Sequence, residues 1–372
     1  MRHKKLSIAA IIVVIFLVLG FQYLRAGIPF LYELFVKKND IELTQEKQES
    51  LNVLLLGIGG GTHEGSELTD TIILANINPQ TQEVNMFSLP RDLWLPELGD
   101  RINSAYAIGQ GKDKKGMVLA KAVVEKITGH PVDYVFVIDF AGFVKGVDHM
   151  GGIKVDVKRA FDDLEYPVAG NEADLCGNKE EELPKLATSE ASLVEIFPCR
   201  YKHISFDKGV QYMDGQTALE FVRSRHATGG EGSDFARSSR QQEVIAALRK
   251  KALSLGILLN PVKVFGLINI VQQNINTDIK QEEYDDFVKL ARKLEDATVK
   301  NYVINITDEA TQEYGLLVNP PTSEDYSYKW VLVPRKGNGD FSEIQSYIEC
   351  VEKGKACEIT ETGISSANDA LQ

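Results

Sequence analysis

Residues 52–60 read NVLLLGIGG, an almost uninterrupted apolar run that ends in glycines. A short run of this kind is typical of a strand that is buried on both faces of a sheet. Residues 69–92 follow as TDTIILANINPQTQEVNMFSLPRD, which predicts two further strands joined by a turn at Pro79. We therefore expect the globular part of the chain to begin here, around a central sheet.

Helical patterns are interspersed with these strands. Apolar residues recur at helical spacing in four segments, 112–128, 140–150, 215–223 and 237–255. A further strand is expected at 134–138. This alternation is typical of a layered α/β or α+β domain. Residues 283–372 read as more strands and a helix, and two outcomes stay open for them: completion of the main sheet or a small appendage.

The charge of the chain is acidic and unevenly distributed. Its 372 residues carry 41 Lys+Arg and 53 Asp+Glu, a formal net charge of −12. This balance argues against a protein that coats nucleic acid, because such proteins need a basic surface. Residues 162–197 alone contain ten acidic residues and two basic ones. We interpret this segment as an exposed acidic insertion, since a calcium site would need a tighter array of carboxylates.

Residues 6–24 form a long apolar stretch of 19 positions without a charge. At about 1.5 Å per residue, a helix of this length spans roughly 28 Å, close to the hydrocarbon thickness of a bilayer. Basic residues within 1–5 precede it, so the positive-inside rule places the N-terminus in the cytoplasm and the main domain outside. We expect an uncleaved, single-pass signal anchor in the cell membrane, followed by a stalk at 25–50; a cleaved signal peptide is the alternative.

Four cysteines support export, because disulfides persist in oxidising compartments. They are Cys176, Cys199, Cys350 and Cys357. Four cysteines allow three pairings, of which the local one, Cys176 with Cys199 and Cys350 with Cys357, is the most economical. None of them has the spacing of a zinc site.

Arginines gather in residues 221–242, FVRSRHATGGEGSDFARSSRQQ. Arg223 and Arg225 lie two apart, so in an extended chain their guanidinium groups point the same way. Arg237 and Arg240 lie three apart and would share one face of a predicted helix.

The start of that helix strengthens the case for an anion site. Ser233 or Asp234 is well placed to cap it, and Gln241 lies next to Arg240. A helix N-terminus together with forked guanidinium groups binds phosphate oxygens. The segment therefore predicts a site for a phosphorylated ligand.

A second polar group precedes it in the chain. Asp70 opens the strand LTDTIILA, Arg91 and Asp92 follow a strand in SLPRDLW, and Arg101 lies in DRINSAY. Carboxylates at strand ends beside arginines suit a magnesium ion that bridges phosphate groups. The alternatives are a turn or cap role for Asp70 and a salt bridge between Asp92 and Arg91.

The order of these blocks resembles the LytR-CpsA-Psr (LCP) family of membrane-anchored cell-wall enzymes. The likeness runs from about residue 52 to about residue 255, and MDGQTALEFVRSRH and SDFARSSRQQ are its most specific blocks. The resemblance implies a three-layer α/β/α catalytic domain over 51–282, with a mixed central sheet and a hydrophobic tunnel for a polyprenyl chain. It also implies magnesium-assisted transfer of a glycopolymer phosphate from a polyprenyl-pyrophosphate lipid to peptidoglycan, outside the cytoplasmic membrane.

The resemblance also implies roles for individual residues. Asp70 matches the magnesium ligand, with manganese as the alternative ion. The remaining matches are Arg91 with Asp92 for the block S-x-x-R-D, Arg223 with Arg225 for R-x-R, and Arg237 with Gln241 for the pyrophosphate-binding pair.

We expect the arginines to bind pyrophosphate and to stabilise developing charge, since phosphoryl transfer depends mainly on positioning and charge neutralisation. The expected ligands are Arg91, Arg101, Arg223, Arg225, Arg237, Arg240 and Gln241. Asp92 or Asp234 is expected to accept a proton from the sugar hydroxyl.

The chain departs from the family pattern at two positions. Gly59 stands where many members have an aspartate, and Leu68 where many have an arginine. The metal site would then have one fewer carboxylate, with His63, Glu64 or Asp92 as candidate replacements. Two other functions stay open: a non-catalytic receptor for polyprenyl pyrophosphate or wall glycan, and a polyprenyl-pyrophosphate pyrophosphatase.

Overall fold

The computed structural model describes residues 50–61, 65–186, 191–258, 260–294, 296–307 and 313–366. The expected membrane anchor at 6–24, and the expected stalk at 25–50 except for its last residue, lie outside these ranges. Within the described ranges, no helix is both long enough and apolar enough to cross a membrane.

A mixed sheet of six strands forms the centre of the molecule. Its spatial order is β11 (Ile275–Thr277), β6 (Tyr134–Asp139), β1 (Leu51–Ile58), β2 (Thr69–Asn78), β3 (Glu83–Ser88) and β12 (Thr298–Val303). β1 runs parallel to β6 and antiparallel to β2, and β12 runs parallel to β3. The expected mixed central sheet is thus confirmed, and the region after residue 282 supplies one of its two edge strands, β12.

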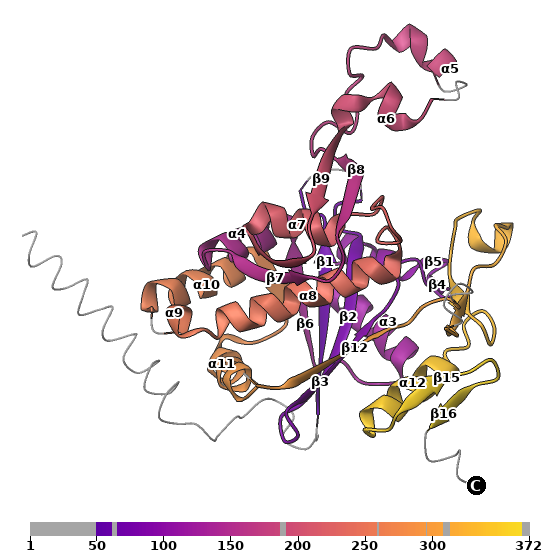
Figure 1. Ribbon diagram of the computed structural model, residues 1–372. Coiled ribbons are helices and arrows are strands. Elements are labelled where there is room, and N and C mark those ends of the chain that lie inside the picture. The colour runs from indigo at the N-terminus through magenta and orange to yellow at the C-terminus, as the bar shows by residue number, and fades with distance from the viewer. Residues whose placement is uncertain are drawn as a thin grey trace, which may run out of the picture.

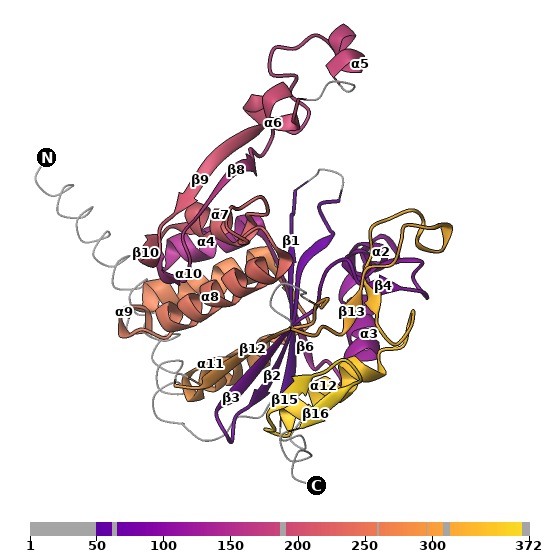
Figure 2. The same cartoon turned by 45° about the vertical axis from the view of Figure 1, so that its right-hand side comes forward.

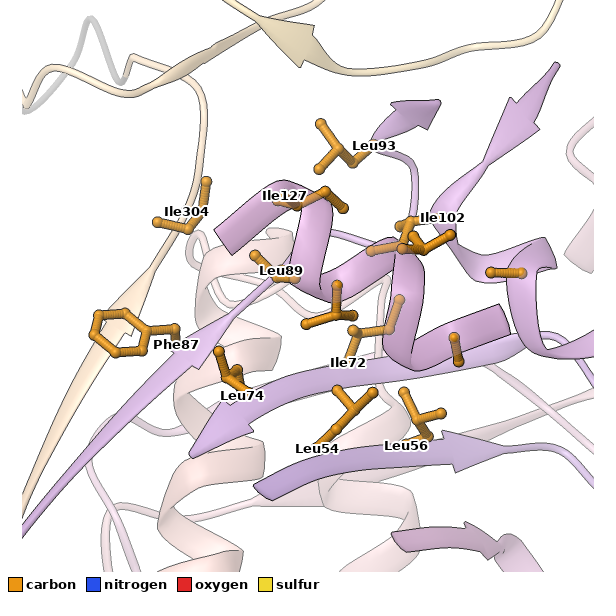
Figure 3. Close-up of a cluster of buried hydrophobic side chains, with 14 of the residues drawn as sticks. Leu54, Leu56, Ile72, Leu74, Phe87, Leu89, Leu93, Ile102, Ile127 and Ile304 are labelled. Atoms are coloured by element: carbon orange, nitrogen blue, oxygen red, sulfur yellow. The ribbon is translucent and has the colours of Figure 1, made fainter. Parts of the chain in front are cut away.

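β1 is buried on both faces, as its apolar run predicts. Leu54 and Leu56 belong to one core, together with side chains of α3 and α12, whereas Leu51 and Val53 belong to a second core on the opposite face. Figure 3 shows the first of these cores, with Leu54 and Leu56 lying beside Ile72 of β2. Successive residues of a strand point to opposite faces, so a run that is apolar at every position needs cover on both sides.

Helices cover both faces of the sheet, so the molecule has three layers (Figure 2). One side carries α2 (Ala105–Gly111), α3 (Gly116–Thr128) and α12 (Ser342–Glu352). The other side carries α4 (Phe140–His149), α7 (Gly215–Arg223), α8 (Asp234–Ala252), α9 (Leu255–Leu258), α10 (Pro261–Asn274) and α11 (Tyr284–Lys293). Short 3-10 helices lie at Ile102–Ser104, Glu180–Glu182, Pro198–Arg200, Gln281–Glu283 and Glu324–Tyr326.

An arm projects from the body above α7 (Figure 1). It is the antiparallel ribbon of β8 (Phe161–Pro167) and β9 (Tyr201–Phe206), which carries α5 (Leu183–Leu186) and α6 (Leu193–Ile196). The base of this ribbon packs with β7 (Ile153–Val157), α4, α7 and α8 in a separate core, and β7 pairs with β10 (Gly209–Met213). The acidic segment 162–197 forms most of the arm, and a disulfide joins Cys176 to Cys199 within it.

The C-terminal region closes the first core. Its short strands are β13 (Leu317–Val318), β14 (Val333–Pro334), β15 (Cys357–Ile359) and β16 (Ile364–Ser366), and β4 (Trp94–Leu95) and β5 (Asp100–Arg101) pair nearby. A second disulfide joins Cys350 of α12 to Cys357 of β15. Of the three pairings that the sequence leaves open, the structure therefore has the local one.

Candidate active site

Asp70 and Arg91 meet at one edge of the central sheet. Asp70 is the second residue of β2, and Arg91 follows the end of β3. Because β2 and β3 are antiparallel, with Ile73 opposite Ser88, the start of one strand lies beside the end of the other. Arg91 Nη1 donates to Asp70 Oδ1 at 2.7 Å. Sheet topology thus brings together two residues that are 21 apart in the chain.

Arg225 reaches the same carboxylate from the helical layer, where its Nη2 donates to Asp70 Oδ1 at 3.1 Å. Arg223 is the last residue of α7, which confirms the helix predicted at 215–223, and Arg225 lies beyond its end. The chain leaves the helix at Ser224 with φ −52° and ψ 133°, so both arginines still line one cavity. The Arg223 guanidinium lies 4.3 Å from the centre of the Phe140 ring.

α8 presents Arg237 and Gln241, about one turn apart, to the same place. Ser233 caps this helix, because its Oγ accepts the backbone N–H of Ala236 at 3.2 Å. The helix consequently begins at Asp234, three residues before the predicted start. The side chain of Asp234, a candidate proton acceptor, lies outside the described part of the structure.

Arg240 is turned into the core, which corrects the expectation that it binds pyrophosphate. It is 3% exposed, and its Nη2 donates to the carbonyls of Ser224 at 2.8 Å and Glu231 at 3.0 Å. Its guanidinium lies 4.6 Å from the centre of the Phe161 ring. Positions three apart differ by about 60° around an α-helix. That rotation turns Arg240 away from the cavity. Its side chain instead holds the backbone of Ser224, the residue between Arg223 and Arg225, from the core side.

Asp92 and Arg101 support Arg91 from the interior. Asp92 is 4% exposed, its Oδ1 accepts a hydrogen bond from Arg101 Nη1 at 2.7 Å, and its Oδ2 lies 3.3 Å from Arg91 Nε. Neither Asp92 nor Arg101 is among the residues that line the two hollows described below. This corrects the expectation that Asp92 accepts a proton, whereas phosphate binding by Arg101, whose Nη1 is held by Asp92, stays a prediction. A buried carboxylate between two guanidinium groups instead holds Arg91 in place.

Two adjoining hollows share the residues Asp70, Thr71, Arg237 and Gln241. The larger, which we call the arginine cavity, has a volume of about 350 Å³. Its other lining residues are Phe140, Asp163, Glu165, Pro167, Tyr201, Val222, Arg223, Arg225 and His226. The smaller hollow, of about 20 Å³, is lined in addition by Ile72, Ser88, Leu89, Pro90, Arg91, Ser238, Val303, Ile304 and Asn305.

Several of these lining residues were not singled out by the sequence. Glu165, Tyr201 and Asn305 lie far from the motifs along the chain, and no local pattern marks them. His226 directly follows the R-x-R pair, and that position was the one signal that could have identified it.

The electrostatics of the cavity centre on Asp70. Burial alone would raise the pKa of this carboxyl, but the guanidinium groups of Arg225, Arg91 and Arg237 outweigh that effect and hold the pKa below its usual range. Asp70 is therefore ionised at neutral pH. Across the two hollows four arginines stand against three carboxylates, and one of these, Asp163, has both oxygens engaged in hydrogen bonds, so the neighbourhood of Asp70 favours an anionic ligand.

The donor set at Asp70 fits a magnesium ion that is shared with phosphate. Its carboxylate is ionised and faces a cavity suited to phosphate oxygens, and Mg²⁺ commonly takes one or two carboxylates and fills its other positions with phosphate oxygens and water. At position 59 the chain offers a glycine and thus no side-chain ligand. His63 and Glu64, the candidate replacements, lie outside the described residues.

Comparison with known proteins gives one family match and many relatives. The model of the LytR_cpsA_psr family matches residues 33–326. The polyisoprenyl-teichoic acid–peptidoglycan teichoic acid transferase TagU of Bacillus cereus is 28% identical over 256 residues, 68% of this chain and 68% of that protein. The Bacillus subtilis protein of the same name is 27% identical over 248 residues, 65% of this chain and 64% of that protein.

Solved structures share the fold. The Lin1025 protein of Listeria innocua superposes with a TM-score of 0.52 at 25% identity, covering 82% of this chain and 98% of that one. TagV of Bacillus subtilis superposes with a TM-score of 0.52 at 22% identity, covering 82% and 97%.

Proposed function

Because the chain belongs to the LytR_cpsA_psr family, we propose that it transfers a glycopolymer, as its phosphate, from a polyprenyl-pyrophosphate carrier to peptidoglycan. That it is a transferase of the LCP type follows from the family and from relatives named as teichoic acid–peptidoglycan transferases. The observation that carries the finer proposal is the convergence of Arg91, Arg223, Arg225 and Arg237 on two adjoining hollows that share the carboxylate of Asp70.

The arginines would act on the pyrophosphate. Guanidinium groups form paired hydrogen bonds to phosphate oxygens, and Arg225 and Arg237 approach the cavity from two different elements. Charge that develops on the leaving phosphate is then neutralised without reorganisation of the protein. The apolar side chains of Phe140 and Val222, which line the same cavity, suit the start of the polyprenyl chain.

Asp70 is the residue that would hold magnesium, with manganese as an alternative because both ions prefer oxygen ligands. When bound, such an ion polarises a phosphate oxygen and neutralises charge. The hydrogen bonds from Arg91 and Arg225 to Oδ1 orient the carboxylate for this role.

We propose that the enzyme acts outside the cytoplasmic membrane, anchored through residues 6–24 with the N-terminus in the cytoplasm. The apolar run and its basic N-terminal flank support this topology. The two disulfides lie in the part that would be exported, and disulfides persist in an oxidising compartment. A lipid carrier in the same bilayer would then lie within reach of the domain.

The full chain in detergent micelles, supplied with a polyprenyl-pyrophosphate-linked glycan and peptidoglycan, tests this proposal. We expect glycan to become attached to peptidoglycan in the presence of Mg²⁺ or Mn²⁺, and the attachment to fall when EDTA removes the metal. Arg237→Ala should lower transfer by about 100-fold or more while the fold stays intact. Lys250→Ala, an exposed site on the same helix, is the matched control and should transfer normally.

Each of the two alternative functions would give a different result in this assay. Release of glycan phosphate to water, with no gain on peptidoglycan, would identify a pyrophosphatase. Binding of the carrier without turnover would identify a receptor. Full transfer by a correctly folded Arg237→Ala protein would overturn the assignment of the arginine cavity.

A further inference from the structure

The arginine cavity contains a carboxylate–imidazole pair that has not yet been given a role: His226 is the last residue of the block MDGQTALEFVRSRH, and Glu165 lies outside the motifs. Glu165 of β8 and His226, which follows α7, both line the cavity, and Glu165 Oε2 lies 3.4 Å from His226 Nδ1. Both side chains are accessible from solvent, with exposed fractions of 44% and 59%. A ligand that enters the cavity therefore meets both of them beside Arg223 and Arg225.

A single buried carboxylate, Asp163, holds both members of this pair. Asp163 is 1% exposed, and its Oδ2 accepts hydrogen bonds from Ser224 Oγ at 2.6 Å and from the backbone N–H groups of Arg225 at 3.2 Å and His226 at 3.3 Å. Its Oδ1 accepts the backbone N–H of Glu165 at 2.9 Å. One side chain thus fixes the strand that carries the carboxylate to the turn that carries the imidazole.

The backbone on both sides is shaped for this contact. The pairing of β8 with β9 shifts register between Asp163 and Tyr166, around Glu165. Such irregularities redirect side chains and are frequent next to active sites. On the other side, Arg240 holds the carbonyl of Ser224. The pair therefore lies in a pre-organised part of the cavity wall.

Three other carboxylates in the described part of the site, those of Asp70, Asp92 and Asp163, are poor proton acceptors for a substrate in this cavity. Asp70 is ionised, but two guanidinium groups take its Oδ1, and they lower its pKa and with it its basicity. Asp92 is buried between Arg91 and Arg101 and does not line the cavity. Both oxygens of Asp163 already accept hydrogen bonds, Oδ1 from the backbone N–H of Glu165 and Oδ2 from Ser224 Oγ.

We propose that His226 is the general base of the transfer and that Glu165 orients it, an inference that rests on the proposed function. With its proton on Nδ1 directed at Glu165, the imidazole leaves Nε2 as the acceptor, the arrangement that a carboxylate imposes on a catalytic histidine. The distance of 3.4 Å shortens when substrate binds, as is usual for catalytic contacts that are long in the free enzyme.

The chemical step balances without any further reactant. The oxygen of the acceptor hydroxyl forms a bond to the phosphorus that carries the glycopolymer, and its proton passes to His226 Nε2. The phosphoanhydride bond breaks, and its electron pair stays on the oxygen of the departing polyprenyl phosphate. Arg223 and Arg225 lie where that charge develops.

The base role predicts how transfer depends on pH. An imidazole base must be neutral to accept a proton, so kcat/KM should fall about tenfold per pH unit on the acid side of its profile and level off toward alkaline pH. The charged groups that line the cavity with His226 are of both signs. They are the carboxylates of Glu165 and Asp163 on β8 and of Asp70 on β2, and the guanidinium groups of Arg225 in the same turn and of Arg223.

The test uses the full chain in micelles and the transfer assay described above, from pH 5 to 9. His226→Gln should lower kcat/KM by about 100-fold and abolish the low-pH limb. Glu165→Gln should lower kcat about tenfold with KM unchanged. Added imidazole should restore part of the transfer by His226→Ala. The control is His203→Gln, because His203 pairs with Asp162 on the surface of the arm and should transfer normally.

The outcomes separate the two proposals. If the unaltered chain transfers glycan and His226→Gln does so at the same rate with the same pH profile, the base assignment is overturned and the proposed function stands. If the unaltered chain transfers nothing at any pH, the proposed function fails, and this inference fails with it. Normal binding of polyprenyl pyrophosphate by His226→Gln, together with lost turnover, supports a role in the chemical step.

Discussion

Replacing Asp163 by alanine would remove the carboxylate that joins β8 to the turn after α7. The side chain is 1% exposed and accepts hydrogen bonds from Ser224 Oγ at 2.6 Å and from the backbone N–H groups of Arg225 at 3.2 Å, His226 at 3.3 Å and Glu165 at 2.9 Å. A hydrogen bond to a charged group contributes about 1.5–3 kcal/mol, and water that enters the vacated space restores part of this. We expect Asp163→Ala to lower the free energy of unfolding by about 4 kcal/mol, near the upper end for one substitution.

Urea unfolding at pH 7, with both disulfides oxidised, measures this loss. Asp163→Asn keeps the shape but turns an amide group toward hydrogen-bond donors, so it should lose about half as much, roughly 2 kcal/mol. Asp162→Asn is the matched control, because Asp162 is the next residue along the chain and is half exposed beside His203. It should unfold at the same urea concentration as the unaltered chain.

Hydrogen exchange adds a local measure of the same change. The amides of Arg225 and His226 should exchange faster in Asp163→Ala, because their acceptor is gone. A loss below about 1 kcal/mol, with unchanged exchange at these two amides, would refute the argument that this carboxylate holds the turn.

Three further predictions concern packing and pH. A Cβ added at Gly215 would lie 2.3 Å from the carbonyl oxygen of Val144, a backbone atom that cannot move alone, so Gly215→Ala should lower thermal stability by more than about 2 kcal/mol. Gly146 lies in the helix that Val144 belongs to and has open space around it, so Gly146→Ala should raise stability by about 0.5–1 kcal/mol. Burial raises the pKa of Glu352 to about 7, above its value of 4.5 in the unfolded chain. Because the folded protein holds this proton more tightly, the contribution of Glu352 to the free energy of unfolding is fully present below pH 4.5 and is lost as the pH rises through 7. Glu352→Gln should therefore stabilise the protein by about 1–2 kcal/mol at pH 8, since the side chain is 18% exposed and solvent screens part of the cost, and should change little at pH 4.5; equal urea midpoints at pH 8 would contradict this.

Much of the fold could be predicted from local patterns. The run in β1 is apolar at every position because Leu54 and Leu56 face one core and Leu51 and Val53 face another. The helix at Phe140–His149 begins after Asp139, whose side chain accepts the backbone N–H of Gly142, so its start was visible in the sequence. Such signals involve residues that are close together in the chain, so they can be recognised without knowledge of the rest of the sequence.

The site was predicted less completely, because contacts between distant elements decide it. Spacing grouped Arg237 with Arg240, but the rotation of α8 against its neighbours sends Arg240 into the core. Asp92 looked like a candidate base, yet it is enclosed by Arg91 and Arg101. Glu165 belongs to the acidic segment, where nothing in its surroundings along the chain distinguishes it from solvated neighbours.

The sequence by itself determined that this protein has a doubly covered central strand and enough arginines for a phosphate site, because periodicity and residue type are local properties. Only the tertiary structure decided that Arg91 and Arg225 share the carboxylate of Asp70. It alone also decided that Glu165 stands beside His226. The physical reason is that the direction of a side chain depends on how its helix or strand is rotated and placed when separate cores are buried, and spacing along the chain does not specify that placement.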